Sequence, residues 1–119
     1  MFVVERHSPN RLDIRIEGKL DSDAMRAALD SLEAQSEDIE QGRMLYRIQN
    51  FDLPTFGALG VELSRLPSLF RMIGRFSRVA VVADRKWLRK ASEIEGKLLP
   101  GVDIRAFEDD AAAERWLEG

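Results

Sequence analysis

Val79-Ala80-Val81-Val82-Ala83 is an unbroken run of five apolar residues, with Arg78 before it and Asp84 after it. A valine-rich run of this length is typical of a strand inside a parallel sheet, because such a strand is covered on both faces. Its parallel neighbours can be reached only through crossover connections, which are usually helices. The run therefore predicts an α/β fold in which strands and helices alternate along the chain.

The sequence before this run predicts a hairpin followed by a helix. Residues 2–6 and 12–17 alternate between apolar and polar side chains, which is the pattern of half-buried strands. Alanine, methionine and leucine then recur at helical spacing over residues 22–35. Asp21 or Ser22 can be the N-cap, because either side chain has an oxygen that accepts a hydrogen bond from the first turn. The chain is therefore expected to open with an antiparallel hairpin and one helix.

The stretch between this helix and the apolar run predicts one strand and two helices. Residues 44–48 form a short β-prone segment. Leucines at helical spacing predict a helix over residues 56–66, Pro67 interrupts it, and a second short helix is expected over residues 68–76. The crossover that leads into the apolar strand is therefore expected to contain two helices joined at a kink.

The sequence after the run predicts one more strand and two more helices. Asp84 can cap a helix over residues 85–95, residues 102–107 predict a last strand, and Asp109 can cap a final helix. The complete order is ββαβα(α)βαβα. We therefore predict an α/β fold in one domain over residues 1–119, with a mixed, mainly parallel sheet of five strands and helices packed on it.

The composition excludes several chemistries. The chain of 119 residues has no cysteine, a single histidine at His7 and a net charge of −3. Disulfides and thiolate metal sites are excluded, and one imidazole in a turn cannot build a catalytic triad or a metal site. An acidic chain is not expected to bind nucleic acid, and no apolar window approaches the length of a membrane span. We therefore expect a cytoplasmic protein that is not an enzyme and needs neither metal nor cofactor.

The crossover segment, residues 53–76, is unusually apolar for one small domain, and residues 61–97 carry nine basic and four acidic side chains. The simplest interpretation is a solvated helix face above a core. The alternative is an exposed apolar patch, because such patches mark partner, oligomer or ligand sites. On this alternative the binding surface comprises Leu53, Phe56, Leu59, Phe70, Ile73 and Trp87, with a basic rim of Arg71, Arg75, Arg85 and Lys86.

Three stretches of the sequence resemble a known family. They are residues 76–88, where the apolar strand is followed by Asp84 and Trp87, the strand at residues 102–107, and the terminal segment Ala111-Ala112-Ala113-Glu114-Arg115-Trp116-Leu117. In this order they resemble the SpoIIAA-like branch of the STAS superfamily, and the similarity extends over the whole chain. The resemblance implies a non-catalytic STAS fold used for protein contacts or apolar ligands. The same branch is similar to lipid-binding domains of the SEC14 kind.

The resemblance also implies one candidate modification site. In anti-sigma antagonists of this superfamily, a Ser or Thr that opens the helix after the third strand is phosphorylated within an Asp-Ser-Ser/Thr-Gly motif. Thr55 occupies that place and Gly57 matches the glycine, whereas Pro54 and Phe56 depart from the motif. An unmodified Thr55 would serve equally well as an N-cap. The sequence leaves both roles of Thr55 open.

Two functions of different classes fit these observations. The leading hypothesis is a non-enzymatic regulatory module that forms a homodimer or docks a protein partner through residues 53–76. The alternative is a carrier or sensor of a lipid-like anion, with the apolar helices around its tail and the basic residues at its head group. A pocket of several hundred Å³ would favour the alternative.

Overall fold

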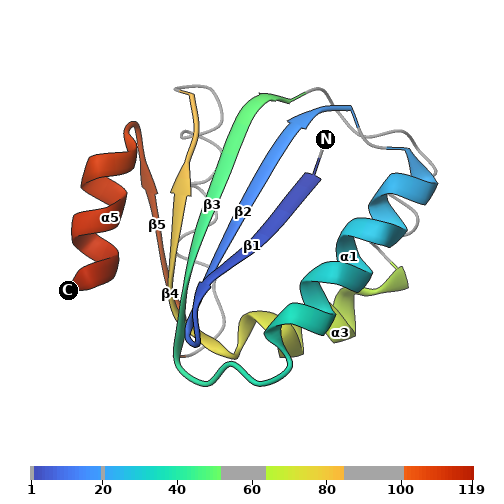
Figure 1. The fold of residues 1–119 in the computed structure, drawn as a ribbon, viewed down its shortest axis with the longest axis horizontal. Helices are drawn as coiled ribbons and strands as arrows, with labels where there is room; N and C mark the ends of the chain where they lie inside the picture. The colour runs from blue at the N-terminus through green and yellow to red at the C-terminus, as the bar shows by residue number, and fades with distance from the viewer. Residues whose placement is uncertain (1, 20, 52–63, 85–100) are drawn as a thin grey trace.

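The computed structural model describes residues 2–19, 21–51, 64–84 and 101–119, and Figure 1 shows their arrangement. After the opening hairpin, the described helices and strands alternate as the sequence predicts, except between β4 and β5, where residues 85–100 lie outside the described ranges. In chain order the elements are β1 (Phe2–Ser8), β2 (Arg11–Gly18), α1 (Ser22–Ser36), β3 (Gly42–Phe51), α3 (Leu66–Ile73), β4 (Phe76–Val82), β5 (Asp103–Phe107) and α5 (Asp110–Glu118).

The five strands form one mixed sheet in the order β1-β2-β3-β4-β5. β1 and β2 pair antiparallel, and each later pair of neighbours is parallel. In β4, Val79 pairs with Met44 of β3 on one side and with Ile104 of β5 on the other. The predicted α/β fold with a mixed, mainly parallel sheet of five strands is therefore confirmed.

Side chains of the sheet point alternately into two apolar clusters, because successive residues of a strand face opposite sides. The larger cluster joins the sheet to α1 and α3, and the smaller one joins it to α5. Val79 belongs to the larger cluster and the next residue, Ala80, to the smaller one, so β4 is apolar on both faces. In Figure 1, α5 lies beside β5 at one end of the sheet, whereas α1 and α3 lie towards the other end.

Aspartate side chains begin both of the helices whose caps are described. Asp21 Oδ1 accepts a hydrogen bond from Ala24 N, and Asp109 Oδ1 accepts one from Ala112 N, both at 2.8 Å. Of the two N-cap candidates for α1, Asp21 is therefore the one used.

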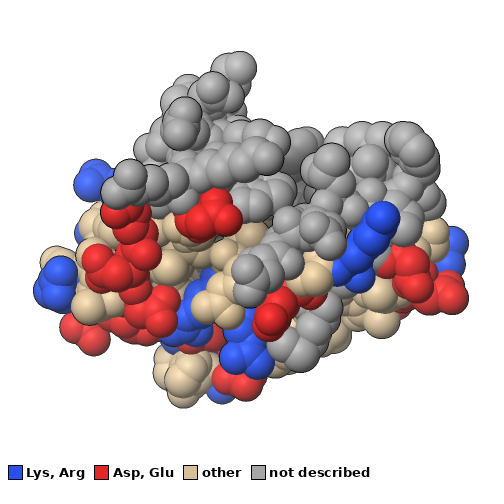
Figure 2. All heavy atoms as spheres, turned by 90° about the horizontal axis from the view of Figure 1, so that it is seen from above, with Lys and Arg blue, Asp and Glu red and all other residues tan. Residues whose placement is uncertain are grey.

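Both caps lie at the edge where the parallel strands end, which Figure 2 views from above. Over the described part of that face, acidic and basic side chains lie next to one another, and among the described residues no group of acidic or histidine side chains is arranged to hold a metal ion.

Helix α3 starts where the sequence places the kink. Ser64 is helical, Arg65 is in a turn, and α3 begins at Leu66. Pro67 falls in the first turn of α3, where its missing N–H leaves no hydrogen bond unmade. The remainder of the predicted helix 56–66 lies outside the described residues, as does the predicted helix 85–95. No helix within the described ranges is long and apolar enough to cross a membrane.

The predicted end of this second helix is wrong. The sequence predicts a helix over residues 68–76, but α3 ends at Ile73, and Phe76 is the first residue of β4. The backbone carbonyl of Arg75 accepts a hydrogen bond from Gly42 N at 2.9 Å, which draws the chain into the sheet beside β3. Phe76 is 1% exposed there, so its burial comes from the strand and not from a helix face.

Gly42, at the start of β3, lies where three elements meet. A Cβ at this position would clash with Ile39 Cγ2 and would lie 3.0 Å from the carbonyl oxygen of Asn10 and 3.2 Å from Phe76 Cδ1. Ile39 and Phe76 are fully buried and the third neighbour is backbone, so none of the three can move away at low cost. Only glycine fits here without a shift of the surrounding structure.

We therefore expect Gly42→Ala to lower the free energy of unfolding by about 1 to 3 kcal/mol, the usual cost of overpacking a core. Urea unfolding followed by circular dichroism measures this change. The exposed neighbour Glu40 supplies the control, because Glu40→Ala removes only solvated atoms. Equal stability of the two variants would show that the space around Gly42 is looser than the structure indicates.

Candidate functional site

Much of the predicted apolar surface lies outside the described residues. This holds for Leu53, Thr55, Phe56 and Leu59 in the segment 52–63 and for Arg85, Lys86 and Trp87 in the segment 85–100. The side chain of Phe70, within α3, is also outside the description. Ile73, Arg71 and Arg75 are the members of the predicted surface and rim that the structure describes.

These three residues have different environments in and after α3. Ile73 is half-buried and packs against the larger apolar cluster, next to the buried Met72. Arg71 and Arg75 are exposed. Arg71 Nη2 lies 3.4 Å from Ser68 Oγ, and Arg75 Nη1 donates to the carbonyl oxygen of Glu37 at 2.6 Å. Arg71 therefore remains at the solvent face, whereas Arg75 also fastens the C-terminal end of α1 to the turn before β4.

A third arginine of this region, Arg65, is held by α1. Its Nη1 donates to Asp30 Oδ1 at 2.6 Å and its Nη2 donates to Glu33 Oε2 at 2.8 Å. The hydrogen bond that Arg65 donates to Asp30 raises the pKa of the Arg65 guanidinium. The start of α3 is therefore tied to the middle of α1 by charged hydrogen bonds, which fixes the described end of the crossover segment.

The densest polar cluster surrounds Asp13, on the sheet face opposite to α1. Asp13 as a whole residue is 5% exposed, so its carboxylate is buried. Arg11 Nε donates to it at 2.6 Å, His7 Nε2 lies 3.2 Å away, and Arg47 Nη1 lies 3.6 Å away. A buried carboxylate is costly unless positive groups or hydrogen bonds compensate it, and here the guanidinium groups of Arg11 and Arg47 lie beside it.

The same two arginines extend the cluster to α5. Arg11 forms a two-pronged ion pair with Glu114, at 2.7 and 3.0 Å, and Arg47 Nε donates to Asp110 Oδ1 at 3.1 Å. The hydrogen bond to Arg11 lowers the pKa of the Glu114 carboxyl, and it raises the pKa of the guanidinium in return. The positive and negative groups satisfy one another, so this cluster acts as a structural tie between the hairpin and α5.

A hollow of about 510 Å³, lined mostly by polar and charged residues, borders this cluster. Its charged walls include Arg11 and Glu114, which already bind each other, and Arg43, which donates to the carbonyl oxygen of Leu117 at 2.8 Å. Arg11 and Glu114 therefore neutralise each other within the fold. The alternation in the sequence predicts that this face of β2 is polar. It does not predict that the face is buried, because α5, which packs there, comes about 100 residues later in the chain.

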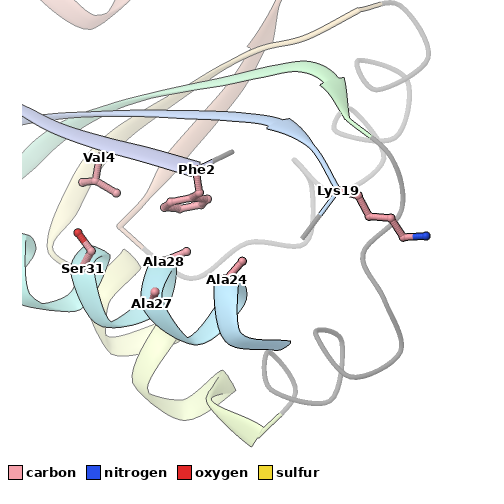
Figure 3. A pocket seen from close by; sticks show the side chains of 7 residues that line it. All are labelled: Phe2, Val4, Lys19, Ala24, Ala27, Ala28 and Ser31. Carbon is pink, nitrogen blue, oxygen red and sulfur yellow. The ribbon is translucent and has the colours of Figure 1, made fainter. Parts of the chain in front are cut away.

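A second, largely apolar hollow of about 320 Å³ lies between β1 and α1 (Figure 3). Phe2 and Val4 point from β1 towards the helix, and Ala24, Ala28 and Ser31 face them from α1. Lys19 stands at one end with its side chain directed away from the hollow in this view. The hollow is lined by seven residues, which are Phe2, Val4, Lys19, Ala24, Ala27, Ala28 and Ser31.

The sequence analysis missed this hollow. Its signals were present as small residues at helical spacing in α1, at Ala24, Ala27 and Ser31, and as apolar side chains at alternate positions of β1. Small residues on a helix favour either close packing or a gap, and the sequence does not say which. Only the distance between α1 and β1 shows that a gap results.

The fold and these surfaces define a small STAS-type domain with a mixed sheet and no metal cluster among its described residues. The model of the SpoIIAA-like family matches residues 11–118. The chain therefore belongs to the SpoIIAA-like family, and the resemblance seen in the sequence is confirmed. The family has the STAS fold and includes regulatory interaction modules such as the anti-sigma factor antagonists.

Solved structures share this fold over nearly their whole length. One is a protein of the DUF3478 family from Shewanella loihica PV-4 with a SpoIIAA-like fold, 23% identical, with a TM-score of 0.73, covering 98% of this chain and 92% of the other. The Bacillus cell fate determinant SpoIIAA in its phosphorylated form is 18% identical, with a TM-score of 0.57 and coverage of 98% and 99%. The unphosphorylated anti-sigma factor antagonist SpoIIAA is 17% identical, with a TM-score of 0.53 and coverage of 98% and 97%. No curated protein matches the chain.

The Arg11–Glu114 pair should make stability depend on pH. Because the folded state lowers the pKa of Glu114, the pair stabilises the fold above the unfolded pKa of about 4.3 and loses its effect as the pH falls through the lower, folded value. We expect Glu114→Gln to cost about 0.5 to 1 kcal/mol at pH 7, a value reduced by the partial exposure of the pair, and nothing at a pH below the folded pKa.

Urea unfolding of both proteins over this pH range measures the difference. Glu118→Gln, on the exposed end of the same helix, is the matched control. A difference between wild type and Glu114→Gln that does not shrink at low pH would exclude the ion pair as its cause.

Proposed function

We propose that this protein is a non-enzymatic regulatory module that acts in the cytoplasm and docks a protein partner or a second copy of itself through residues 53–76. The observation that carries the proposal is the match of the SpoIIAA-like family model to residues 11–118. Among proteins of the same fold is an anti-sigma factor antagonist, which is a regulator. The apolar composition of residues 53–76 gives such a module a surface with which to bind.

The use of charge in the described residues supports the same proposal. Arg11, Arg47 and Arg65 each bind carboxylates on an element other than their own. Arginines that form ion pairs between helices and strands stabilise the fold, and such ion pairs leave these side chains unsuited to transfer protons to a substrate. The exposed Arg71, beside the apolar residues of α3, offers a polar margin of the kind that surrounds protein interfaces.

If residues 53–76 form the docking surface, Phe70→Glu should abolish association while leaving the melting temperature close to that of the wild type. Met72→Ala provides the contrast, because Met72 is 5% exposed and its truncation should cost about 2 to 4 kcal/mol of stability without affecting association. Sedimentation velocity measures association and thermal unfolding measures stability. Should Phe70→Glu unfold the protein as a core mutation does, Phe70 is not part of a docking surface.

A second candidate function is a carrier or sensor of a lipid-like anion. The hollow between β1 and α1 favours it, because about 320 Å³ is at the lower end of the volumes of ligand pockets and the walls are mainly apolar. A single acyl chain could lie between Phe2 and the alanines of α1. Lys19, at the end of the hollow, could turn towards an anionic head group.

On this second candidate, native mass spectrometry with added dodecanoate should give an adduct of one molecule per chain. Ala27→Trp should fill the hollow from an exposed position and reduce binding at least tenfold. Ala34→Trp is the matched control, because Ala34 is an exposed residue of α1 outside the hollow. Equal binding by both tryptophan variants would rule the hollow out as the site.

A further inference from the structure

The two edge strands of the sheet are protected to different degrees. Among the described residues, β1 and β5 each have one strand neighbour. β5 carries Asp103 and Arg105, exposed charges of the kind that keep strand edges from pairing with other chains. The start of β1 is Phe2-Val3-Val4, which has no charge, proline or glycine. Among the described residues, the start of β1 is therefore the part of the sheet edge that is least protected against pairing.

The register identifies the backbone groups that face outward from this edge. Arg43 N donates to the carbonyl oxygen of Asn10 at 2.7 Å, so Asn10 and every second residue after it, including Ile14, direct their backbone groups towards β3. Val4 lies opposite Ile14 in the antiparallel pair. The N–H and C=O groups of Val4, and likewise those of Phe2, must therefore point away from β2.

The rest of this edge is occupied by side chains of the same chain. Gln35 Nε2 reaches the carbonyl oxygen of Val4 at 3.5 Å, which agrees with its outward direction but is a weak contact. Arg6 Nη1 donates to Asp38 Oδ1 at 2.6 Å and to the carbonyl oxygen of Gln35 at 3.2 Å. These bonds close the edge from Arg6 onward. The part that remains available for another strand is Phe2–Val4.

We propose that β1 pairs antiparallel with β1 of a second copy of this chain, with Val3 opposite the second copy's Val3. In this register Phe2 lies opposite the second copy's Val4, so outward N–H and C=O groups meet across the two-fold axis. Two such pairs supply four backbone hydrogen bonds. The two sheets then join into one continuous sheet of ten strands, twice the five of a single copy.

The side chains fit this register better than the register that is shifted by two residues. On the α1 face, the second copy's Phe2 would lie beside Val4, where the hollow between β1 and α1 has room for an aromatic ring. Four apolar side chains would then lie side by side across the two copies. They are Ile14 and Val4 of one copy, followed by Phe2 and Ile16 of the second copy. A shift by two residues would place Phe2 opposite Arg6, which would put an apolar ring against a guanidinium already bound to Asp38. Self-pairing therefore explains both the open edge and the hollow beneath it.

Residues 2–4 are not part of the proposed docking segment 53–76, so the inference does not depend on that proposal. Strand pairing over three residues buries less area than a standard interface, so we expect a dissociation constant on the order of 10 to 100 µM. The interface would be isologous and closed, so it would produce dimers and no longer polymers.

A charge-swap pair tests the proposal. Val3 is half-buried on the face opposite to α1 and next to the exposed Arg15, so it can accept a polar side chain. Val3→Lys and Val3→Glu each place two like charges opposite one another at the two-fold axis, which opposes pairing. Each variant alone should be monomeric, and an equimolar mixture should restore dimers, by sedimentation velocity at about 500 µM. Gln49→Lys and Gln49→Glu, at an exposed position of β3, should dimerise like the wild type both alone and mixed.

A second variant covers the case in which the position 3 variants fold poorly. Val4→Pro removes an outward N–H that makes no bond to β2, so it should keep the hairpin and lose the dimer. The proposal is overturned if the wild type stays monomeric at this concentration, if Val4→Pro dimerises normally, or if the mixed position 3 variants remain monomeric while folded. Dimers that Phe70→Glu disrupts and the β1 variants do not would instead assign self-association to residues 53–76.

Discussion

The buried carboxylate of Asp13 is the constraint on which the rest of the molecule depends. A charge in the middle of a sheet face is tolerated only where positive groups and hydrogen bonds replace water. Arg11 and Arg47 provide this compensation, and each then binds a carboxylate at one face of α5. The charge on β2 thus fixes where the C-terminal helix lies, and it joins the first hairpin to the last helix of the chain.

This arrangement divides the sheet unequally. α5 covers β3, β4 and β5 through the small cluster around Leu45 and Ala80, and α1 and α3 cover the opposite face through the larger cluster. Among the described elements, β1 contacts mainly β2 and α1. The least constrained backbone of the described sheet is therefore at its N-terminal edge, beside the hollow lined by the small residues of α1.

The fold was largely predictable because local periodicity and burial agreed. The run at residues 79–83, the alternation in the hairpin and the aspartate caps each depend on neighbours a few residues away. The candidate site was less predictable. The sequence does not reveal that Arg75, a predicted rim residue that is exposed, donates to the Glu37 carbonyl, and it predicts a helix at Phe76, which instead opens a strand beside Gly42. In both cases a contact with a residue more than 30 positions away decides the outcome.

The α/β class, the order of the described strands and the two-sided burial of β4 follow from local pattern in the sequence, whereas membership of the SpoIIAA-like family was indicated by a resemblance over longer stretches and is shown by the family model. The tertiary structure alone decided that Asp13 is buried, that its arginines hold α5, and that α1 stands far enough from β1 to leave a hollow. The physical reason is that charge compensation and cavity volume depend on distances between elements. A one-dimensional pattern carries no information about those distances until the chain has packed.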